Sequence, residues 1–478
     1  MNLQKIMNGT GATSVVPDIE IAALCRDSRK VTAGCVFVCI RGTGVDSHAF
    51  AASAVENGAA AVVVERDMGL PCQVIVPDGR FAWAQMCANW FDHPSRRLKL
   101  IGVTGTNGKT STTYFLKAIL EAAGYRVGLI GTIQNLIGDT VLPSAHTTPD
   151  PYDLQRMLCE MADAGCAYTV MEVSSHALDQ DRVGGCEFEL GLFTNLTQDH
   201  LDYHETMERY ADAKRKLFTM CKRAVFNRDD EWYARMQDGC PCPCVTFSAK
   251  DDAADYTAKN ICQRPDGIDF ELVGYDGIGR VRLATPGFFS VYNALAAASC
   301  GLALGIPFDT VTGALSVAGI VKGRAEVVPT GENFTVVIDY AHTPDGLINI
   351  CDTLNACKQG RLVTVFGCGG DRDRGKRPKM GQAAASRSDF MIVTSDNPRS
   401  EEPSAIIADI LEGIADTTTP YVVIENRVEA IRFAVQNAKD GDTVLLAGKG
   451  HETYQILKDG TIHLDEREVV QAALAERE

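Results

Sequence analysis

Short hydrophobic runs separated by turn residues fill the first hundred positions of this chain. The runs at 35–40 (CVFVCI), 59–65 (AAAVVVE) and 72–78 (CQVIVPD) are typical of buried strands, and the segment 81–93 (FAWAQMCANWFDH) is typical of a helix. This alternation predicts a small α/β domain over residues 1–97.

A second pattern begins after the polar break at residues 94–97. An apolar strand predicted at 98–104 leads into a glycine-rich turn, and the following helix has apolar residues at helical spacing, among them Phe115, Leu116 and Ile119. Another apolar run follows this helix. Strand, turn, helix and strand in this order predict a βαβ unit that opens a second domain.

The second domain is expected to end after a β-rich stretch near residues 250–287 and a helix. From Arg324 onward, apolar strands again alternate with helical segments, and five strands are predicted, at 334–341, 361–368, 389–395, 421–425 and 442–448. Such alternation is typical of a mostly parallel sheet covered on both faces. The expected fold class is therefore α/β in three domains, 1–97, 98–323 and 324–478, with a mostly parallel central sheet and a Rossmann-like last domain.

Composition and charge narrow the class of protein. No apolar run reaches about 18 residues and the N-terminus lacks a secretory layout, so we expect a soluble, cytoplasmic protein. The net charge of −16 disfavours a general surface for nucleic acid. The 17 scattered cysteines fit a reducing compartment. For Cys240, Cys242 and Cys244, a loop with incidental thiols is favoured over a zinc site.

The strongest chemical signal is the glycine-rich loop GTNGKT at residues 105–110. Between a strand and a helix, it would offer backbone N–H groups to phosphates, Lys109 to the terminal phosphates and the Thr110 hydroxyl to Mg²⁺. The loop departs from the general P-loop template, which requires glycine where this chain has Val103. The alternative is an ordinary glycine-rich turn with an exposed lysine.

Three further polar residues follow in the second domain. Glu172 and His200 come at the ends of successive predicted strands, where P-loop enzymes hold a metal ion. Taken alone, each could be a capping or core residue. Lys214 lies in a predicted helix, and from its surroundings in the sequence it is interpreted as a surface or snorkelling lysine.

Charged residues also follow strands of the third domain. Arg372 and Arg399 come after two of the predicted strands, and a glycine-rich segment from Gly448 to Glu452 comes after the last. Strand C-termini of open α/β sheets face the ligand crevice, so both arginines are candidates for binding a carboxylate. The alternative is a pair of salt-bridged loop arginines.

Motifs from Asp27 to Tyr454 together carry a family resemblance. Besides the glycine-rich loop they are EVSSHAL, TNLTQDHLDYH, VYNALAAA, DYAHTPDGL, GCGGDRDRGKR, DNPRSEEP and AGKGHETYQ. With them the chain resembles the Mur ligases, and more narrowly the members that add meso-diaminopimelate as the third amino acid. The resemblance implies one domain each for a uridine nucleotide, ATP and the incoming amino acid, and the family's GTNGK[TS] loop accounts for Val103.

The resemblance also implies which residues bind each ligand. The ATP set would be Gly105, Thr106, Asn107, Gly108, Lys109, Thr110, Ser111, Asn293, Arg324 and Asp339. The ligands of two Mg²⁺ ions would be Thr110, Glu172, His200 and Lys214, the last as a carbamate formed with CO₂. The catalytic set would be Lys109, Glu172, His200 and Lys214. The UDP-sugar set would be Ser28, Thr43, Gly44, Val45, Thr147, Thr148, Ser174, Gln180 and Arg182. The diaminopimelate set would be Arg372, Asp396, Asn397, Pro398, Arg399, Gly448 and Glu452.

The implied activity is an ATP-dependent amide ligation in cytoplasmic peptidoglycan precursor synthesis, carried out by a monomer. The D-glutamyl side-chain carboxylate of UDP-N-acetylmuramoyl-L-alanyl-D-glutamate would become an acyl phosphate, and meso-diaminopimelate would displace the phosphate. Because lysine lacks the distal carboxylate of diaminopimelate, Arg399 is expected to select the latter, with Glu452 binding the distal ammonium.

Three alternatives remain at this point. They are a lysine-adding ligase, a folylpolyglutamate synthetase and a non-catalytic nucleotide-binding regulator. The DNPR sequence disfavours the first, and the DSR sequence near the N-terminus disfavours the second. The joint presence of Glu172, His200 and Lys214 disfavours the third.

Overall fold

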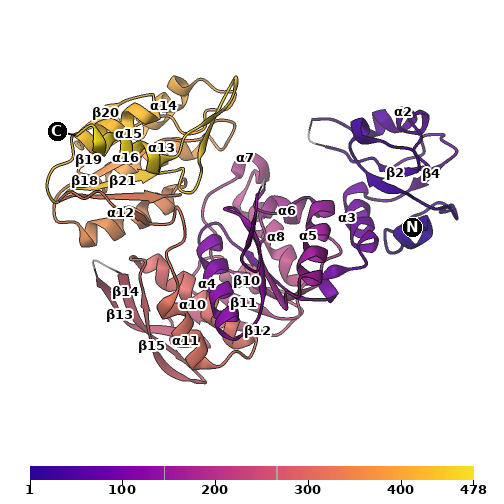
Figure 1. Cartoon of the computed structure of the whole chain (residues 1–478), viewed down its shortest axis with the longest axis horizontal. Coiled ribbons are helices and arrows are strands. Elements are labelled where there is room, and N and C mark those ends of the chain that lie inside the picture. The colour runs from indigo at the N-terminus through magenta and orange to yellow at the C-terminus, as the bar shows by residue number, and fades with distance from the viewer. Residues whose placement is uncertain (43, 145, 265–266, 478) are drawn as a thin grey trace. The chain divides into compact units, whose positions relative to one another are not determined.

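The chain forms two compact units, each assembled from separate segments. The computed structural model describes residues 1–42, 44–144, 146–264 and 267–477. The first unit comprises Met1–Gly102, Tyr125–Gly191 and Lys216–Arg223. The second comprises Val103–Gly124, Leu192–Arg215 and Ala224–Glu478. Both contain helices and strands, as Figure 1 shows, which confirms the predicted α/β class.

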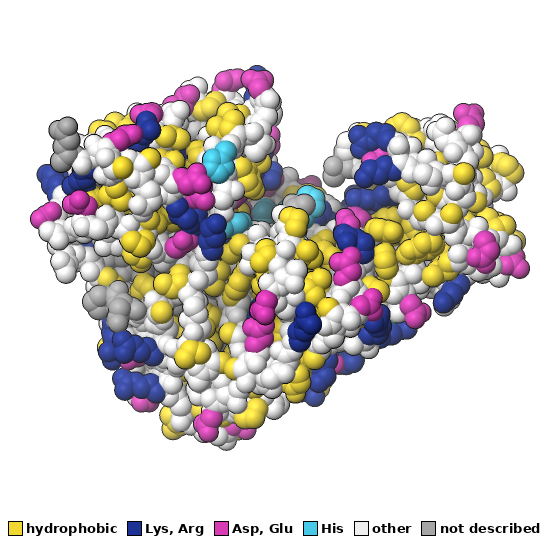
Figure 2. All heavy atoms as spheres, viewed as in Figure 1, with side chains coloured by type: hydrophobic (Ala, Val, Ile, Leu, Met, Phe, Trp, Pro, Cys, Tyr) yellow, Lys and Arg dark blue, Asp and Glu magenta, His cyan; other side chains and the backbone are white. Residues whose placement is uncertain are grey.

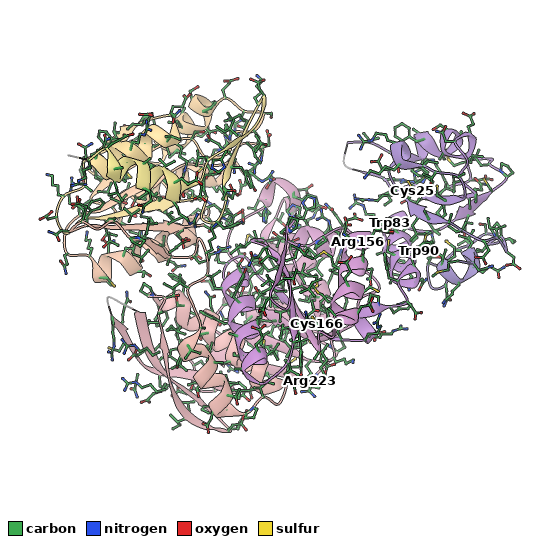
Figure 3. All side chains as sticks on the ribbon, in the orientation of Figure 1. Cys25, Trp83, Trp90, Arg156, Cys166 and Arg223 are labelled. Carbon is green, nitrogen blue, oxygen red and sulfur yellow. The ribbon has the colours of Figure 1, made fainter. Side chains whose placement is uncertain are left out.

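The first unit begins with a four-stranded parallel sheet. Its strands, neighbours in chain order, are β1 (Ala23–Cys25), β2 (Cys35–Val38), β3 (Ala61–Val64) and β4 (Gln73–Ile75). Its helices are α1 (Leu3–Ile6), α2 (Ala51–Glu56) and α3 (Gly79–Trp90). β2 and β3 are buried along their whole length, with Trp83 and Met86 of α3 in one core cluster and Ala51 and Ala54 of α2 in another. Trp83 and Trp90 both lie on α3 (Figure 3).

The rest of the first unit supplies strands of the central sheet. β9 (Tyr168–Glu172) pairs in parallel with β6 (Val127–Ile130), and β7 (Asn135–Ile137) and β8 (Thr140–Leu142) extend the sheet in antiparallel fashion. Its helices are α5 (Pro151–Asp163) and α6 (Ser175–Asp179). Two strands, β5 (Lys99–Thr104) and β10 (Phe188–Phe193), have their first residues in this unit and their last residues in the other.

In the second unit, helix α4 (Lys109–Ala122) follows the glycine-rich loop and packs against α10 (Phe288–Ala303) and α11 (Phe308–Val317). Short helices and parallel strands precede α10: α7 (Leu201–His204), α8 (Met207–Arg215), β11 (Ala224–Asn227), α9 (Tyr233–Gln237) and β12 (Cys244–Ser248). The predicted β-rich stretch is confirmed as β13 (Tyr256–Arg264), β14 (Gly267–Gly274) and β15 (Gly277–Leu283), an antiparallel meander.

The C-terminal part of the second unit carries a six-stranded sheet. Its spatial order is β16 (Glu326–Val328), β17 (Thr335–Asp339), β21 (Thr443–Ala447), β18 (Leu362–Phe366), β19 (Phe390–Val393) and β20 (Tyr421–Val423). Only β16 pairs in antiparallel fashion among these described strands. One face is covered by α12 (Pro344–Cys357), α13 (Lys376–Ala385) and α14 (Pro403–Glu412), the other by α15 (Arg427–Gln436) and α16 (Glu466–Ala475). The five predicted strands and their helical cover are thereby confirmed. A separate hairpin is formed by β22 (Tyr454–Leu457) and β23 (Gly460–His463).

Three general features accompany this fold. In the described ranges, no helix has both the length and the apolarity needed to cross a membrane. Lys and Arg side chains are interspersed with Asp and Glu on the face drawn in Figure 2.

All 17 cysteines are free thiols. Cys240 and Cys242 lie in a loop with their sulfurs 3.6 Å apart, and Cys244 lies at the start of β12. The limits of the three predicted domains stay predictions.

Candidate active site

The glycine-rich loop is shaped by contacts that exclude larger side chains at two positions. Gly105 has a φ of 148°, and a Cβ there would lie 1.9 Å from Oγ1 of Thr194. Gly108 has a φ of 83°, and a Cβ there would lie 2.2 Å from Oδ1 of Asn293. The Thr194 hydroxyl also donates to the carbonyl oxygen of Asn107, at 2.8 Å. Glycine is therefore required by both conformation and space, and Asn293 lies directly against the loop.

The first turn of α4 brings together several residues of the predicted ATP set. Lys109 Nζ donates to the carbonyl oxygens of Gly105 and Thr106, at 2.9 and 2.7 Å. Arg324 Nη2 donates to the Thr110 hydroxyl at 2.9 Å, although 214 residues separate the two. Ser111 lies in the same helical turn.

Asp339, at the end of β17, is fixed by main-chain hydrogen bonds. Its carboxylate accepts from the N–H groups of Ala325 and Ala341, at 2.7 and 2.8 Å. Burial raises the pKa of Asp339, and the nearby Arg324 cation opposes that rise. The Arg324 guanidinium also lies 4.7 Å over the Tyr340 ring, so it is oriented both by a stack and by the Thr110 hydroxyl.

Lys214 is buried rather than exposed, which corrects its interpretation as a surface lysine. Its residue exposure is 1%, and Nζ donates to the carbonyl oxygen of Gly105 at 2.7 Å. Nζ also lies 4.5 Å from the centroid of the Tyr210 ring. Burial lowers the pKa of Lys214 well below its usual value, and the Lys109 cation lowers it further. The sequence pattern concealed this because Lys214 lies in a short helix in which five of the nine residues are charged.

His200 caps α7 in the left-handed region, with a φ of 55°. Its Nε2 lies 3.4 Å from a carboxylate oxygen of Asp199, a buried residue that also lies 3.3 Å from Nζ of Lys376 and 3.7 Å from Nε2 of His342. Burial would raise the pKa of Asp199, but the Lys376 cation first, and then the neighbouring His200 and His342, hold it well below its usual value. The imidazole of His200 is thus adjacent to an ionised carboxylate.

Glu172 belongs to the first unit. It is fully buried at the end of β9, and its two carboxylate oxygens accept from the N–H and the hydroxyl of Thr132, each at 2.9 Å. The Thr132 hydroxyl also lies 3.0 Å from that of Thr147. Glu172 is therefore linked to the predicted UDP-sugar segment.

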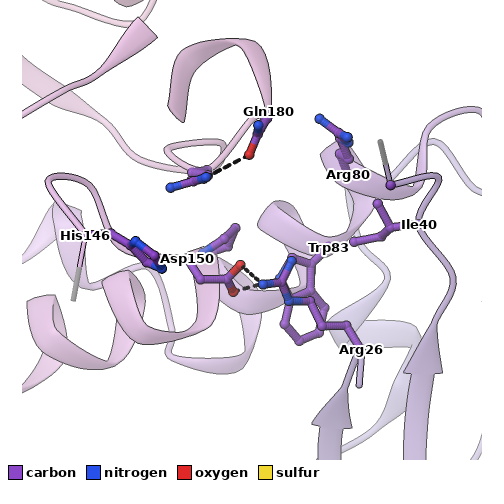
Figure 4. A pocket seen from close by; sticks show the side chains of 10 residues that line it. Arg26, Ile40, Arg80, Trp83, His146, Asp150 and Gln180 are labelled. Carbon is purple, nitrogen blue, oxygen red and sulfur yellow. Dashed lines mark hydrogen bonds and ion pairs between the residues drawn. The ribbon is translucent and has the colours of Figure 1, made fainter. Parts of the chain in front are cut away.

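A pocket of about 260 Å³ lies in the first unit (Figure 4). Its lining comprises Arg26, Ile40, Gly42, Arg80, Trp83, His146, Asp150, Pro151, Gln180 and Arg182. Arg26 pairs with Asp150 at 2.6 Å, and the Trp83 indole donates to the same carboxylate at 3.2 Å. Arg182 donates to Gln180 Oε1 at 2.8 Å. Three guanidinium groups against one carboxylate suit an anionic ligand.

The pocket contains two residues of the predicted UDP-sugar set, Gln180 and Arg182. Thr148 lies at its margin, because its carbonyl oxygen accepts from Arg182 at 3.1 Å. Ser174 accepts from the N–H of Ala177 and so has a capping role in α6. The lining does not include Ser28, Gly44, Val45 or Thr147. Thr43 lies outside the described residues.

The DNPR segment forms a strained turn after β19. Arg399 has a φ of 53°, and its guanidinium donates to the carbonyl oxygens of Gly370 and Asn397, at 2.8 and 3.4 Å. Burial lowers the pKa of Arg399, and the neighbouring Arg372 cation contributes in the same direction. Within the described residues, neither arginine has a carboxylate oxygen within 4.0 Å, so the salt-bridged alternative is not what the structure contains.

The remaining residues of this set surround the same turn. Asp396 is buried, and although burial raises its pKa, the Lys449 and Arg427 cations bring that pKa below its usual value. A Cβ on Gly448 would lie 2.5 Å from Asp396 Oδ2, so the glycine permits close approach. Asn397 donates to Glu452 at 2.9 Å. Pro398 is buried between Asn397 and Arg399.

Several residues of these sites were not identified from the sequence. They are Arg26, Arg80, Trp83, His146 and Asp150 in the pocket, Lys376 beside Asp199, and Arg377, Arg427 and Lys449 around the turn. Arg26 adjoins the DSR segment, and Arg377 and Lys449 lie within the GCGGDRDRGKR and AGKGHETYQ motifs. Their positions next to or within these motifs could have identified them from the sequence, whereas their burial could not be predicted from it.

Comparison with known families agrees with this arrangement. Sequence models match in order for the Mur ligase family catalytic domain (20–78), the Mur ligase middle domain (103–301) and the Mur ligase glutamate ligase domain (323–450). A protein from Caldanaerobacter subterraneus subsp. tengcongensis is 50% identical over 97% of this chain and 96% of its own length. The chain therefore belongs to the Mur ligase family and is an ATP-dependent ligase.

The names of these relatives indicate one group of ligases within the family. The Caldanaerobacter protein bears the name UDP-N-acetylmuramoyl-L-alanyl-D-glutamate--2,6-diaminopimelate ligase. A protein of the same name from Clostridium botulinum is 46% identical over 96% of each chain. A solved structure under that name aligns with a TM-score of 0.70 and 34% identity, covering 100% of this chain and 99% of the other.

Proposed function

We propose that this ligase joins meso-2,6-diaminopimelate to the D-glutamyl side-chain carboxylate of UDP-N-acetylmuramoyl-L-alanyl-D-glutamate in cytoplasmic peptidoglycan precursor synthesis. The names of relatives 46–50% identical to this chain support the substrates. The observation that carries the proposal is the Arg399 guanidinium, which is held at Nη1 by two main-chain carbonyl oxygens and belongs to a group that binds carboxylates in bidentate fashion. Lysine has no second carboxylate to offer it.

The reaction proceeds through an acyl phosphate. A carboxylate oxygen of the D-glutamyl side chain attacks the γ-phosphorus of ATP, and ADP leaves. The neutral amine of diaminopimelate then attacks the acyl carbon, the amide C–N bond forms and phosphate leaves. Because the reacting partners are anionic in the first step, Lys109 and the N–H groups of the glycine-rich loop contribute by neutralising and aligning the phosphates.

The donor set suits magnesium. In the described ranges, no three His, Cys, Asp or Glu side chains converge to hold a metal. Mg²⁺ commonly uses one or two protein carboxylates together with substrate phosphates and water, and Glu172 would be the carboxylate here. Thr110, Glu172 and His200 would hold the ions, which would offset phosphate charge, and Lys214 could join them only as a carbamate because its ammonium form is a cation.

The remaining sites complete the proposal. The Arg26, Arg80 and Arg182 pocket suits the diphosphate of the UDP-sugar, while Asn293, Arg324 and Asp339 would contact ATP. We assign these functions to domains at 1–97, 98–323 and 324–478 of a monomer. The Mur ligase glutamate ligase model begins at residue 323, next to the second of these boundaries, which supports that boundary.

The test is ADP release by purified protein with ATP, Mg²⁺ and UDP-N-acetylmuramoyl-L-alanyl-D-glutamate, comparing meso-diaminopimelate with L-lysine. We expect preference for diaminopimelate, and loss of that preference in Arg399→Ala. The matched control is Arg387→Ala, which removes an arginine of the same domain paired with Asp352. Preference for lysine, or turnover with neither acceptor, would contradict the proposal.

A further inference from the structure

A buried lysine lies between the two segments proposed to bind diaminopimelate. The Lys449 side chain is 0% exposed, and its Nζ donates to Asn397 Oδ1 at 3.0 Å and to Glu452 Oε2 at 2.7 Å. Nζ also lies 5.6 Å from the centroid of the Tyr454 ring. A buried cation of this kind is stabilised by its hydrogen bonds and its counterion, and it orients both.

The three side chains form a closed triangle. Asn397 Oδ1 accepts a second hydrogen bond, from the N–H of Ile456 at 2.9 Å, which fixes the amide. The amide nitrogen Nδ2 then donates to Glu452 Oε2 at 2.9 Å. Glu452 Oε2 thus receives two donors, whereas no hydrogen bond reaches Oε1 from the described part of the chain. One carboxylate oxygen is fixed and the other remains available for an ammonium group.

The same geometry separates Glu452 from Arg399. The charge of Glu452 influences the pKa of Arg399, so the two groups are neighbours, yet no ion pair of up to 4.0 Å joins them among the described residues. Opposite charges in a largely buried site attract strongly. A direct pair would occupy both groups and leave neither for substrate. Lys449 provides Glu452 with a closer cation, at 2.7 Å, so Glu452 is stabilised without an ion pair to Arg399.

We infer that Lys449 is a specificity-determining positioning residue: it fixes Glu452 and Asn397 so that Glu452 binds the distal ammonium of diaminopimelate while Arg399 stays available for the distal carboxylate. This inference rests on the proposed function. It adds that binding of the distal ammonium and carboxylate by Glu452 and Arg399 requires a third charge. This charge is the buried Lys449, which does not contact the substrate and keeps Glu452 and Arg399 from pairing with each other.

The test compares meso-diaminopimelate with 2-aminopimelate, which keeps the distal carboxylate and lacks the distal ammonium. In the wild-type protein we expect kcat/KM to favour diaminopimelate by ~10–100-fold, the range for one charged hydrogen bond. In Lys449→Met the ratio of the two kcat/KM values should fall to within about threefold of unity, because Glu452 is no longer oriented. Equal losses for both substrates would reduce Lys449 to a structural residue and overturn the inference.

Two further variants keep the test decisive if Lys449→Met unfolds. Lys449→Arg retains the cation and should keep most of the wild-type ratio, whereas Lys449→Gln should lose it. Combining Lys449→Gln with Glu452→Gln should lower the ratio no further than either change alone, because both remove the same contact. An unchanged ratio in Lys449→Gln, or additive losses, would contradict the inference.

The matched control is Lys117→Met. Lys117 is also a buried lysine, and it pairs with Glu121 in the same helix, α4. The Lys117→Met change should leave the substrate ratio unchanged. A shift of the ratio in this control would mean that loss of any buried lysine alters specificity, and would overturn the inference. If the wild-type protein does not use diaminopimelate, the proposed function fails. If it does and the Lys449 variants keep the ratio, only the inference fails.

Discussion

The ammonium groups of Lys109 and Lys214 share one acceptor, the carbonyl oxygen of Gly105, at 2.9 and 2.7 Å. Two like charges at one oxygen repel, and Lys214 is the buried partner, so its neutral form is favoured. A neutral amine is the form that attacks CO₂. Carbamate formation would replace a repulsive contact between two cations with an attractive one between Lys109 and an anion.

We therefore expect Lys214→Gln to lower kcat by at least ~100-fold, because the anion that would complete the metal site is lost. Activity of the wild-type protein should fall in CO₂-depleted buffer and return with bicarbonate, and labelling with ¹³C-bicarbonate should give one carbamate resonance that is absent in the variant. Lys216→Gln, which alters an exposed lysine paired with Asp179, is the control. Full activity without CO₂ would refute the carbamate.

In the pocket of the first unit, Arg182→Ala should raise KM for the UDP-sugar substrate by ~10–100-fold and leave KM for ATP nearly unchanged. The reason is that a guanidinium held by Gln180 and Thr148 is already positioned for a phosphate group. Arg156→Ala, on the surface of α5, serves as the control (Figure 3). Equal changes in both KM values would place Arg182 outside the UDP-sugar site.

Gly370→Ala should damage amino-acid binding. A Cβ at this position would lie 1.9 Å from the carbonyl oxygen of Pro398, so the turn that carries Arg399 must move. We expect KM for diaminopimelate to rise by at least ~10-fold, since displacement of the arginine costs about one charged hydrogen bond. Gly313→Ala is the control because no atom lies within 4 Å of its Cβ. Unchanged kinetics in Gly370→Ala would contradict the placement of the turn.

Glu401 gives a prediction for stability against pH. It forms a bidentate pair with the buried Arg377, at 2.7 and 2.9 Å, and this hydrogen bonding lowers the pKa of Glu401 from 4.5 to about 2. Because the folded-state pKa is lower, the stabilisation is complete above pH 4.5 and is lost as the pH falls toward 2.

Glu401→Gln should therefore reduce the free energy of unfolding by about 1–3 kcal/mol at pH 7, and the difference from wild type should shrink between pH 4.5 and 2. Urea unfolding at several pH values measures it. Glu429→Gln, which alters a partly exposed pair with Arg432, should show a much smaller difference. A difference for Glu401→Gln that does not depend on pH would contradict the assigned pKa.

The pattern of apolar residues predicted the elements of the last sheet well because its strands β17, β18, β19 and β21 are nearly continuous buried runs. The first βαβ unit is likewise observed, as β5, α4 and β6. Side chains such as Lys214 and Lys449 could not be located by pattern, since a lysine within a short polar helix or a glycine-rich loop carries no periodic signal. Lys449 is fully buried only because three segments, at 396–397, 449–452 and 454–456, fold around its side chain.

The interleaving of the two units has a consequence for biosynthesis. Helix α4 leaves the ribosome early, but its packing partners α10 and α11 begin 166 or more residues after its last residue, and Ile119 lies against Gly301 of α10. At about 5–20 residues per second, the apolar face of α4 would wait roughly 10–30 s for its cover. Nascent chains of this ligase should therefore be substrates for chaperones until α10 has emerged.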